Sequence, residues 1–238
     1  MPRYGTINTD YIASWFRREE PGGPMWALNL MKYRERAEYS DGRTTELTGA
    51  GADEVYAPHE HLAAVGSRVI LMAPVVYHLR GDDRRWDRIA IAQYRNRMAL
   101  VEMNSSKGFQ ADEQHKDAGM EFTIVMATFP ADGDAVPPQE SGADTGKLML
   151  LQVVGDGDAP DLAQDLDATR IGRFWVEDRF LGDDRTFAEA RFDLISPEAA
   201  AEAASCAFVN DDTGYALIAD PIVDEVARSL TDPSRVLF

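Results

Sequence analysis

Residues 73–97 read APVVYHLRGDDRRWDRIAIAQYRNR, which is the pattern of two strands joined by a polar turn. The apolar, β-branched run over 68–80 predicts the first strand, and Pro74 is expected to bend it because proline cannot donate to a strand ladder. GDDRRWD at 81–87 supplies the turn, and 88–94 supplies the returning strand. This stretch therefore predicts an antiparallel sheet.

The segments on both sides of this hairpin extend it to a β-α-β-β-α-β unit. Val55, Leu62 and Val65 form one stripe of a helix that ends at Gly66. The expected order is a strand at 25–33, a helix at 53–65, strands at 68–80 and 88–94, a helix at 96–105 and a strand at 119–129. Such a unit covers one sheet face with its helices and leaves the other face in need of a partner.

The C-terminal half repeats this order of elements. Its expected elements lie at 147–154, 160–166, 171–180, 186–193, 197–207 and 215–224, with a short tail helix behind them. We expect four regions: an appended N-terminal helix within 1–24, a first unit at 25–130, a linker at 131–146 and a second unit at 147–238. The fold class is therefore α+β, with two tandem units whose antiparallel sheets supply a partner face to each other.

Alternation along the first strand separates two sets of side chains. Trp26, Leu28 and Leu30 share one face, and this wholly apolar set is expected to meet the helices. Asn29 and Tyr33 would then point to the opposite face of the sheet.

Charged residues alternate along two strands of the second unit. If the Ala and Phe side chains pack under helices, Glu189 and Arg191 project between the sheets towards Arg173 and Glu177. Buried charges must be paired, so this pattern predicts an ion-pair network. One interpretation is a polar floor that binds an anionic ligand through Arg191; the alternative is a partly solvated sheet face.

Composition limits the class of protein. The 238 residues carry a net charge of −17, and residues 131–238 account for −15 of it, with 8 Lys/Arg against 23 Asp/Glu. An acidic surface repels phosphate, so neither nucleic acid nor an anionic membrane is an expected partner. No apolar stretch is long enough to span a membrane, the N-terminus does not resemble a secretory signal, and one cysteine excludes an internal disulfide. We expect a cytoplasmic protein.

Several phrases of the first half resemble a known family. ALNLMKYRERAEYSDGR at 27–43, the hairpin at 73–97 and HKDAGMEFTIVMATF at 115–129 occur in the order seen in an uncharacterised branch of the dimeric α+β-barrel proteins. The positions that match its NLLKF-like first strand and its later Tyr-x-x-Arg phrase are Asn29, Lys32, Tyr94 and Arg97. The resemblance implies two ferredoxin-like sheets that face each other, here within one chain. A monomer with this intrachain pseudo-dimer, or a homodimer, would satisfy it.

The same superfamily contains cofactor-independent oxygenases, isomerases, dehydratases, haem enzymes and binding proteins, so the fold does not select a function. Tandem-unit haem relatives take their axial histidine from the second unit, and this second unit has none. We therefore expect no haem, and no nucleotide motif is present. We therefore expect the protein to work without a cofactor.

The four histidines all precede residue 130. His59 and His61 are two positions apart, which does not suit a zinc site on a helix, so no metal site is predicted. His59 and His61 are either exposed polar residues of a helix or, for His59, part of a site: it lies three positions after Tyr56, and that pair could face a cleft beside the sheet. His78 is either a core group or a barrel-lining residue. His115 is either a ligand-binding residue or the anchor of a loop.

Two main function classes follow, and a third, a metal-dependent enzyme, is permitted by the four histidines but supported by no spacing. The first is a small-molecule enzyme without an organic cofactor: an isomerase, a dehydratase or cyclase, or a cofactor-independent oxygenase of a polyketide-like or aromatic substrate. Asn29 would orient an oxygen, Tyr33 would shape the wall, and His59 or His78 would move a proton. The second is a non-catalytic module that binds a small ligand or supports assembly. A histidine-free apolar cavity would favour the second class, and convergent polar groups at Asn29 would favour the first.

Overall fold

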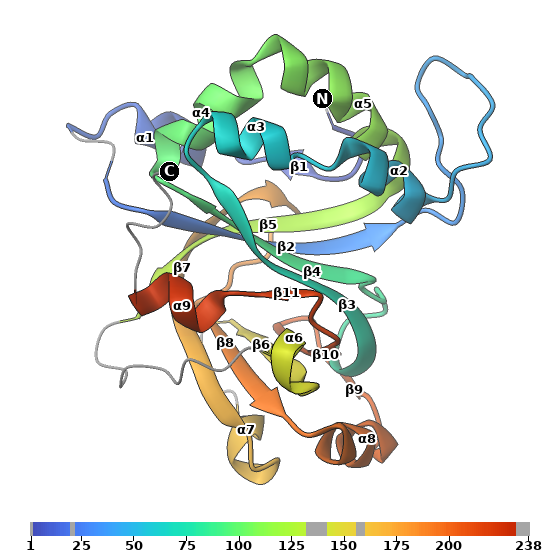
Figure 1. Cartoon of the computed structure of the whole chain (residues 1–238), viewed down its shortest axis with the longest axis vertical. Coiled ribbons are helices and arrows are strands. Elements are labelled where there is room, and N and C mark those ends of the chain that lie inside the picture. Colours follow the sequence, from blue (N-terminus) through green and yellow to red (C-terminus); the bar gives the residue numbers. More distant parts are fainter. Residues whose placement is uncertain (1, 20–21, 132–141, 156–159, 232–238) are drawn as a thin grey trace.

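The computed structural model describes residues 2–19, 22–131, 142–155 and 160–231. Eight strands form a closed antiparallel barrel (Figure 1). They are β2 (Met25–Tyr33), β3 (Arg68–Gly81), β4 (Arg88–Tyr94), β5 (Met120–Pro130), β6 (Leu148–Val154), β7 (Thr169–Gly182), β8 (Glu189–Ile195) and β10 (Gly214–Ala219). Their order is β7-β5-β2-β4-β3-β10-β6-β8, and pairing of β8 with β7 closes the ring. This confirms an α+β fold with antiparallel strands.

Each half contributes four neighbouring strands to the barrel. The first half supplies β5-β2-β4-β3 and the second supplies β10-β6-β8-β7, so both run fourth, first, third, second in chain order. The halves meet where β3 pairs with β10 and where β5 pairs with β7. Both hairpin turns read GDDR, at 81–84 and at 182–185, so the likeness of the halves extends to residues as well as to element order.

Helices cover the outside of the barrel, and short strands extend its edges. The helices are α1 (Thr9–Trp15), α2 (Gly49–Tyr56), α3 (His59–Ala64), α4 (Arg97–Ser105), α5 (Lys107–Gly119), α6 (Gly142–Thr145), α7 (Leu162–Asp165), α8 (Pro197–Ser205) and α9 (Val226–Thr231). The short strands are β1 (Thr6–Ile7), β9 (Val209–Asn210) and β11 (Val223–Asp224). In Figure 1 the layer of α2 to α5 lies above the strands of the first half, whereas α7 and α8 lie at the far end of the second half.

Three element predictions were wrong. The single helix expected over 53–65 is two helices, because Pro58 cannot continue the hydrogen bonds of α2 and instead precedes α3. Helix α5 was not predicted, although Ser106 caps it by accepting a hydrogen bond from Phe109 N. The strand expected over 215–224 is interrupted before β11, next to Pro221. Of the predicted linker, residues 132–141 lie outside the described residues, and α6 follows them.

The assignment of the faces of β2 was also wrong. Trp26, Leu28 and Leu30 point into the barrel, where they join an apolar cluster with Leu151 and Phe192 of the second half. The barrel interior is closed on all sides, so it takes the wholly apolar set of side chains. The mixed set, which includes Asn29 and Tyr33, faces the helices.

The same inversion applies to the second half. Ala190 and Phe192 fill the barrel interior, and Glu189 and Arg191 lie on the outside of β8. Glu189 forms ion pairs with Arg191 and with Arg173 on this outer face. Part of the predicted ion pairing is therefore present, but Glu177 pairs with Arg18 and Arg97 instead, and the prediction that the network lies between the sheets was wrong.

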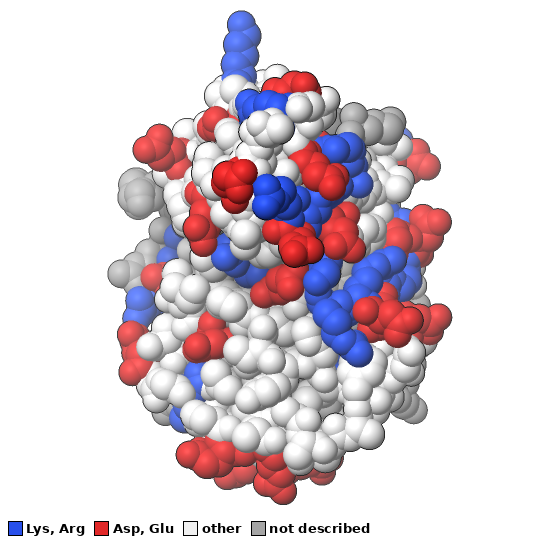
Figure 2. Space-filling view, turned by 90° about the vertical axis from the view of Figure 1, so that its right-hand side faces the viewer, with Lys and Arg blue, Asp and Glu red and all other residues white. Residues whose placement is uncertain are grey.

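Charge is distributed unevenly over the surface. In Figure 2 blue and red side chains are intermixed over the upper part of the visible face, while red side chains gather at the lower end, at the height of α7 and α8 in Figure 1. Among the described residues, no helix is long and apolar enough to cross a membrane.

Candidate functional site

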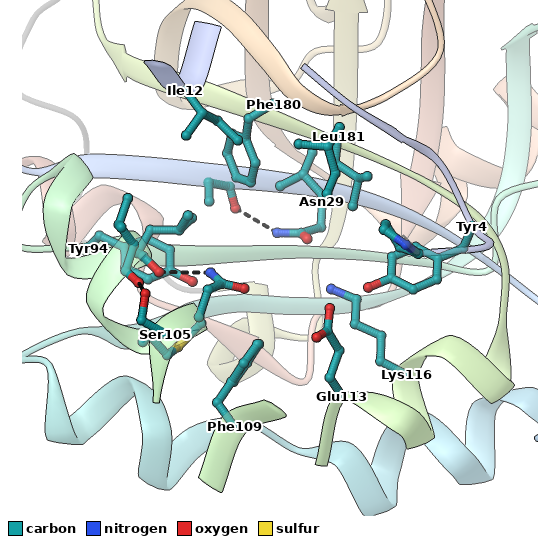
Figure 3. A pocket seen from close by; sticks show the side chains of 18 of the residues that line it. Tyr4, Ile12, Asn29, Tyr94, Ser105, Phe109, Glu113, Lys116, Phe180 and Leu181 are labelled. Carbon is teal, nitrogen blue, oxygen red and sulfur yellow. Dashed lines mark hydrogen bonds between the residues drawn. The ribbon is translucent and has the colours of Figure 1, made fainter. Parts of the chain in front are cut away.

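A cavity of about 300 Å³ lies between the outer face of the first-half sheet and the helices that cover it. Asn29 of β2 and Tyr94 of β4 line its sheet side, and α5 contributes Phe109, Glu113 and Lys116 (Figure 3). A smaller cavity of about 90 Å³ shares Asn29, Tyr94 and Lys116 with it. The two spaces thus meet at the same polar side chains.

Other parts of the chain complete the wall. The N-terminal segment contributes Tyr4 and Ile12, and β7 of the second half contributes Phe180 and Leu181 (Figure 3). Strand β1 holds the N-terminal segment against β7, where Ile7 pairs with Leu181. The cavity therefore belongs to the whole chain, since both halves build it.

Lys116 is the one lysine that lines the cavity. Its Nζ lies 5.6 Å from the ring centroid of Tyr4 and 5.4 Å from that of Tyr56, within the range of a cation–π contact. Its ammonium group has no ion pair or hydrogen bond to any residue that the structure describes. Burial lowers the pKa of Lys116, although Asp53 and Glu113 act in the opposite direction. This amine is therefore more easily deprotonated than an exposed lysine.

The two nearby carboxylates differ in their availability. Asp53 Oδ2 accepts hydrogen bonds from Tyr33 Oη at 2.7 Å and from Arg88 Nη1 at 3.1 Å. Glu113 lies one helical turn before Lys116 on α5 and lines the cavity beside it (Figure 3). Glu113 also has a side-chain hydrogen bond with Tyr4, but it lines the larger cavity and Asp53 does not, so Glu113 is the carboxylate that can exchange a proton with a molecule there.

Three tyrosines add hydroxyl groups to this end of the cavity. Burial raises the pKa of Tyr56, of Tyr94 and of Tyr4, and Glu113 raises the pKa of Tyr4 further. All three therefore stay protonated at neutral pH and can donate hydrogen bonds. Asn29 Nδ2 donates to Ala27 O at 2.8 Å, which fixes the orientation of the amide.

The structure brings only two of the predicted site residues to the cavity. Asn29 and Tyr56 line it, whereas Tyr33 does not line it and donates a hydrogen bond to Asp53. His59 is exposed at the start of α3 and does not line the cavity. His59 therefore does not share a cleft with Tyr56 as predicted. Tyr56 ends α2, and Pro58 precedes a new helix, α3, that begins at His59.

His78 and His115 have structural contacts elsewhere. His78 lies on the part of β3 that pairs with β10, and its Nε2 is 3.0 Å from Trp86 O; burial lowers its pKa. His115 Nδ1 lies 2.6 Å from Tyr39 Oη and so ties α5 to the loop before α2. This contact corresponds to the loop-anchoring alternative.

Glu189 and Arg191 do not line the cavity. In strand register Arg191 pairs with Gln152 as Ala90 pairs with Asn29. The second half therefore carries charge where the first half has a small apolar side chain beside its cavity.

Sequence reasoning did not find Lys116, Glu113, Tyr4 or Tyr94 as site residues. Glu113 and Lys116 are three positions apart, which places them on one side of a helix, but 107–119 was not expected to be helical. The available signal was Ser106 as an N-cap. Among the described residues, no group of three or more His, Cys, Asp or Glu side chains could hold a metal ion.

No protein-family model and no curated protein matches the sequence. Among solved structures, RPA0582 of Rhodopseudomonas palustris, a protein of unknown function, is 28% identical, with 57% of this chain and 100% of that chain covered and a TM-score of 0.50. An anthrone oxidase-like protein is 12% identical, with 84% and 92% covered and a TM-score of 0.48. Over the part that aligns, the chain resembles RPA0582 in fold, and its own eight strands close an antiparallel α+β barrel.

Proposed function

We propose that the cavity binds a small, flat, largely apolar molecule that carries a carbonyl group next to an acidic C–H bond, and that Lys116 removes the proton. The observation that carries this proposal is the Lys116 amine, which has no ion-pair partner among the described residues and lies in a cavity with aromatic walls. Aromatic walls favour a flat aromatic or polyketide-like body. A lowered pKa increases the fraction of Lys116 that carries the free amine, which is the form that acts as a general base.

The surrounding groups fit the charge that this reaction develops. Removal of the proton places negative charge on the substrate oxygen as an enolate. The hydroxyl groups of Tyr56 and Tyr94 can donate to that oxygen, and the ammonium formed on Lys116 offsets its charge. Glu113 can receive the proton from Lys116 and return it at another position. The enolate can then be reprotonated, lose a leaving group or react with oxygen, which are the three reaction types considered for the enzyme.

The test uses 1,8-dihydroxyanthrone, a flat aromatic ketone with an acidic C–H position. In deuterated buffer, the full-length protein should exchange that hydrogen with many turnovers, as measured by NMR. Lys116→Met should lose the exchange, whereas His59→Ala should keep it because His59 lies outside the cavity. Exchange that is unchanged in Lys116→Met would refute the role of Lys116.

A second candidate is a ligand-binding module without catalysis, and the absence of histidine from the cavity lining favours it. The same experiment separates the candidates. A binding module should quench protein fluorescence on addition of the anthrone but should leave the rate of hydrogen exchange at the value of buffer alone. Turnover in the wild type excludes this candidate.

We also propose that the two halves are tandem ferredoxin-like units that make a pseudo-dimer within one chain. Their equal strand order and their GDDR turns support this proposal. Light scattering over a range of concentrations tests it. A mass near 26.4 kDa would support a barrel closed within one chain, and a stable dimer at all concentrations would count against the proposal that the second half replaces a second chain.

A further inference from the structure

The chain uses lysine rarely. Four of its 24 Lys and Arg residues are lysines, namely Lys32, Lys107, Lys116 and Lys147. Lys107 is exposed, and Lys32 Nζ lies 3.4 Å from Asp87 Oδ2. Lys116 alone among the four lines the cavity. A chain that places arginine at almost every cationic position therefore has, in its cavity, the side chain that can lose its proton.

The surroundings of Lys116 leave its nitrogen available as a nucleophile. A salt bridge would hold the proton on Nζ, but Nζ has no such partner among the described residues, and Asp53 is occupied by Tyr33 and Arg88. The rings of Tyr4 and Tyr56 flank Nζ without forming a bond to it. An unprotonated amine in an apolar cavity is the form that adds to carbonyl carbon.

We propose that Lys116 captures aldehydes and ketones as imines in this cavity. Nζ adds to the carbonyl carbon, so that a C–N bond forms and one N–H proton moves to the oxygen. The resulting hydroxyl group leaves as water with the second N–H proton, and a C=N bond remains. No oxidant or reductant is consumed. Glu113, one turn away on α5, can carry the protons between nitrogen and oxygen (Figure 3).

The proposal of imine formation rests on the proposed function only because both use the same cavity and the same Lys116 amine. Proton removal and imine formation are separate reactions of Lys116, and their tests are independent. Hydrogen exchange of the anthrone requires no covalent bond, whereas imine trapping requires no acidic C–H. Either reaction can therefore fail while the other is observed.

The experiment incubates the full-length protein with 1-naphthaldehyde and sodium cyanoborohydride at neutral pH, and peptide mass mapping follows the label at each lysine. Lys116 should be labelled about ten-fold faster than Lys107, because the cavity can hold the aromatic aldehyde beside Lys116 Nζ, whereas Lys107 is exposed. 2-Naphthol, which can fill the cavity but has no carbonyl group, should slow labelling at Lys116 and leave Lys107 unchanged.

Lys116→Arg is the matched variant, because it keeps the charge without a nucleophilic amine. It should lose the fast label and keep the slow label at Lys107. The internal comparison of lysines in the wild type does not depend on the folding of any variant. Equal or slower labelling at Lys116, or labelling there that 2-naphthol does not slow, would overturn the proposal.

Discussion

Arg84 in the hairpin turn of the first half forms a 2.7 Å ion pair with Asp183 in the corresponding turn of the second half. The relationship is reciprocal, because Arg185 forms a 2.7 Å ion pair with Asp82. Each GDDR turn thus offers its first aspartate to the arginine of the other turn. These two ion pairs, here named the cross-turn pairs, join the halves at one end of the barrel.

The first prediction concerns the energy of a cross-turn pair. Asp82 and Arg185 are mostly buried, with 21% and 19% of their side chains exposed, so their coupling should exceed that of an exposed pair. A double-mutant cycle with Asp82→Asn and Arg185→Gln should give a coupling free energy of about 1 kcal/mol or more in urea unfolding. The exposed pair Arg36–Glu46 is the control and should give a value near zero. Equal coupling in the two cycles would contradict the prediction.

The second prediction concerns acid stability. Burial acts to raise the pKa of Asp183, but hydrogen bonds from Arg185 and Arg84 outweigh it and hold that pKa well below its ordinary value. A carboxylate whose pKa is lower in the folded state stabilises the protein above its unfolded pKa of about 3.9, and this contribution is lost as the pH falls through the folded pKa.

The unfolding free energies of the wild type and of Asp183→Asn should therefore differ most at pH 7 and converge as the pH falls below about 4. Urea titrations between pH 7 and pH 2 measure the difference. A difference that stays constant over this range would show that Asp183 stabilises the fold by packing rather than by charge.

The turns also show which part of the fold the sequence determines by itself. GDDRRWD and the alternation around it were sufficient to predict the hairpin, because turn chemistry and strand propensity are local. The choice of face for β2 was not local. The inner face of β2 meets other strands only because the second half closes the barrel; this face carries Trp26, Leu28 and Leu30. The sequence of β2 alone does not indicate that closure.

The candidate site was predictable only in part, for a related reason. Asn29 was found because it interrupts an apolar strand, and Tyr56 because it lies at a helical spacing. Lys116 was missed because α5 is a polar helix with a weak apolar stripe, so nothing in its sequence indicates that one lysine points inward. Its position depends on where α5 packs on the sheet, which is a tertiary property.

The third prediction compares the glycines that begin the two turns. Gly81 and Gly182 have φ values of +149° and +146°, which L-residues rarely adopt, so alanine should destabilise both positions. A Cβ atom at Gly81 would lie 2.6 Å from Tyr215 Cδ1, whereas one at Gly182 would lie 3.3 Å from Ile124 Cγ1. We expect Gly81→Ala to lower the unfolding free energy by about 3 kcal/mol and Gly182→Ala by about half as much. Thermal unfolding tests this order, and the reverse order would contradict it.

The last prediction compares two buried glutamines, one on a barrel strand of each half. Gln93 on β4 is fully buried, and within the part of the chain that the structure describes neither its Nε2 nor its Oε1 has a hydrogen-bond partner. Gln152 on β6 is almost as buried, but its Nε2 donates to Pro160 O at 2.9 Å and its Oε1 accepts from Leu162 N at 3.1 Å. The two positions therefore differ in hydrogen bonding more than in burial.

Methionine has nearly the shape of glutamine but makes no comparable hydrogen bonds. Gln93→Met removes two unsatisfied polar atoms and should raise the unfolding free energy by about 1 kcal/mol, because a buried polar group without a partner costs its full desolvation penalty. Gln152→Met should lower the unfolding free energy by about 2 kcal/mol, since it leaves Pro160 O and Leu162 N without their partners. Urea unfolding of the two variants at pH 7 decides the matter, and a destabilised Gln93→Met would show that the Gln93 amide is satisfied by a buried water.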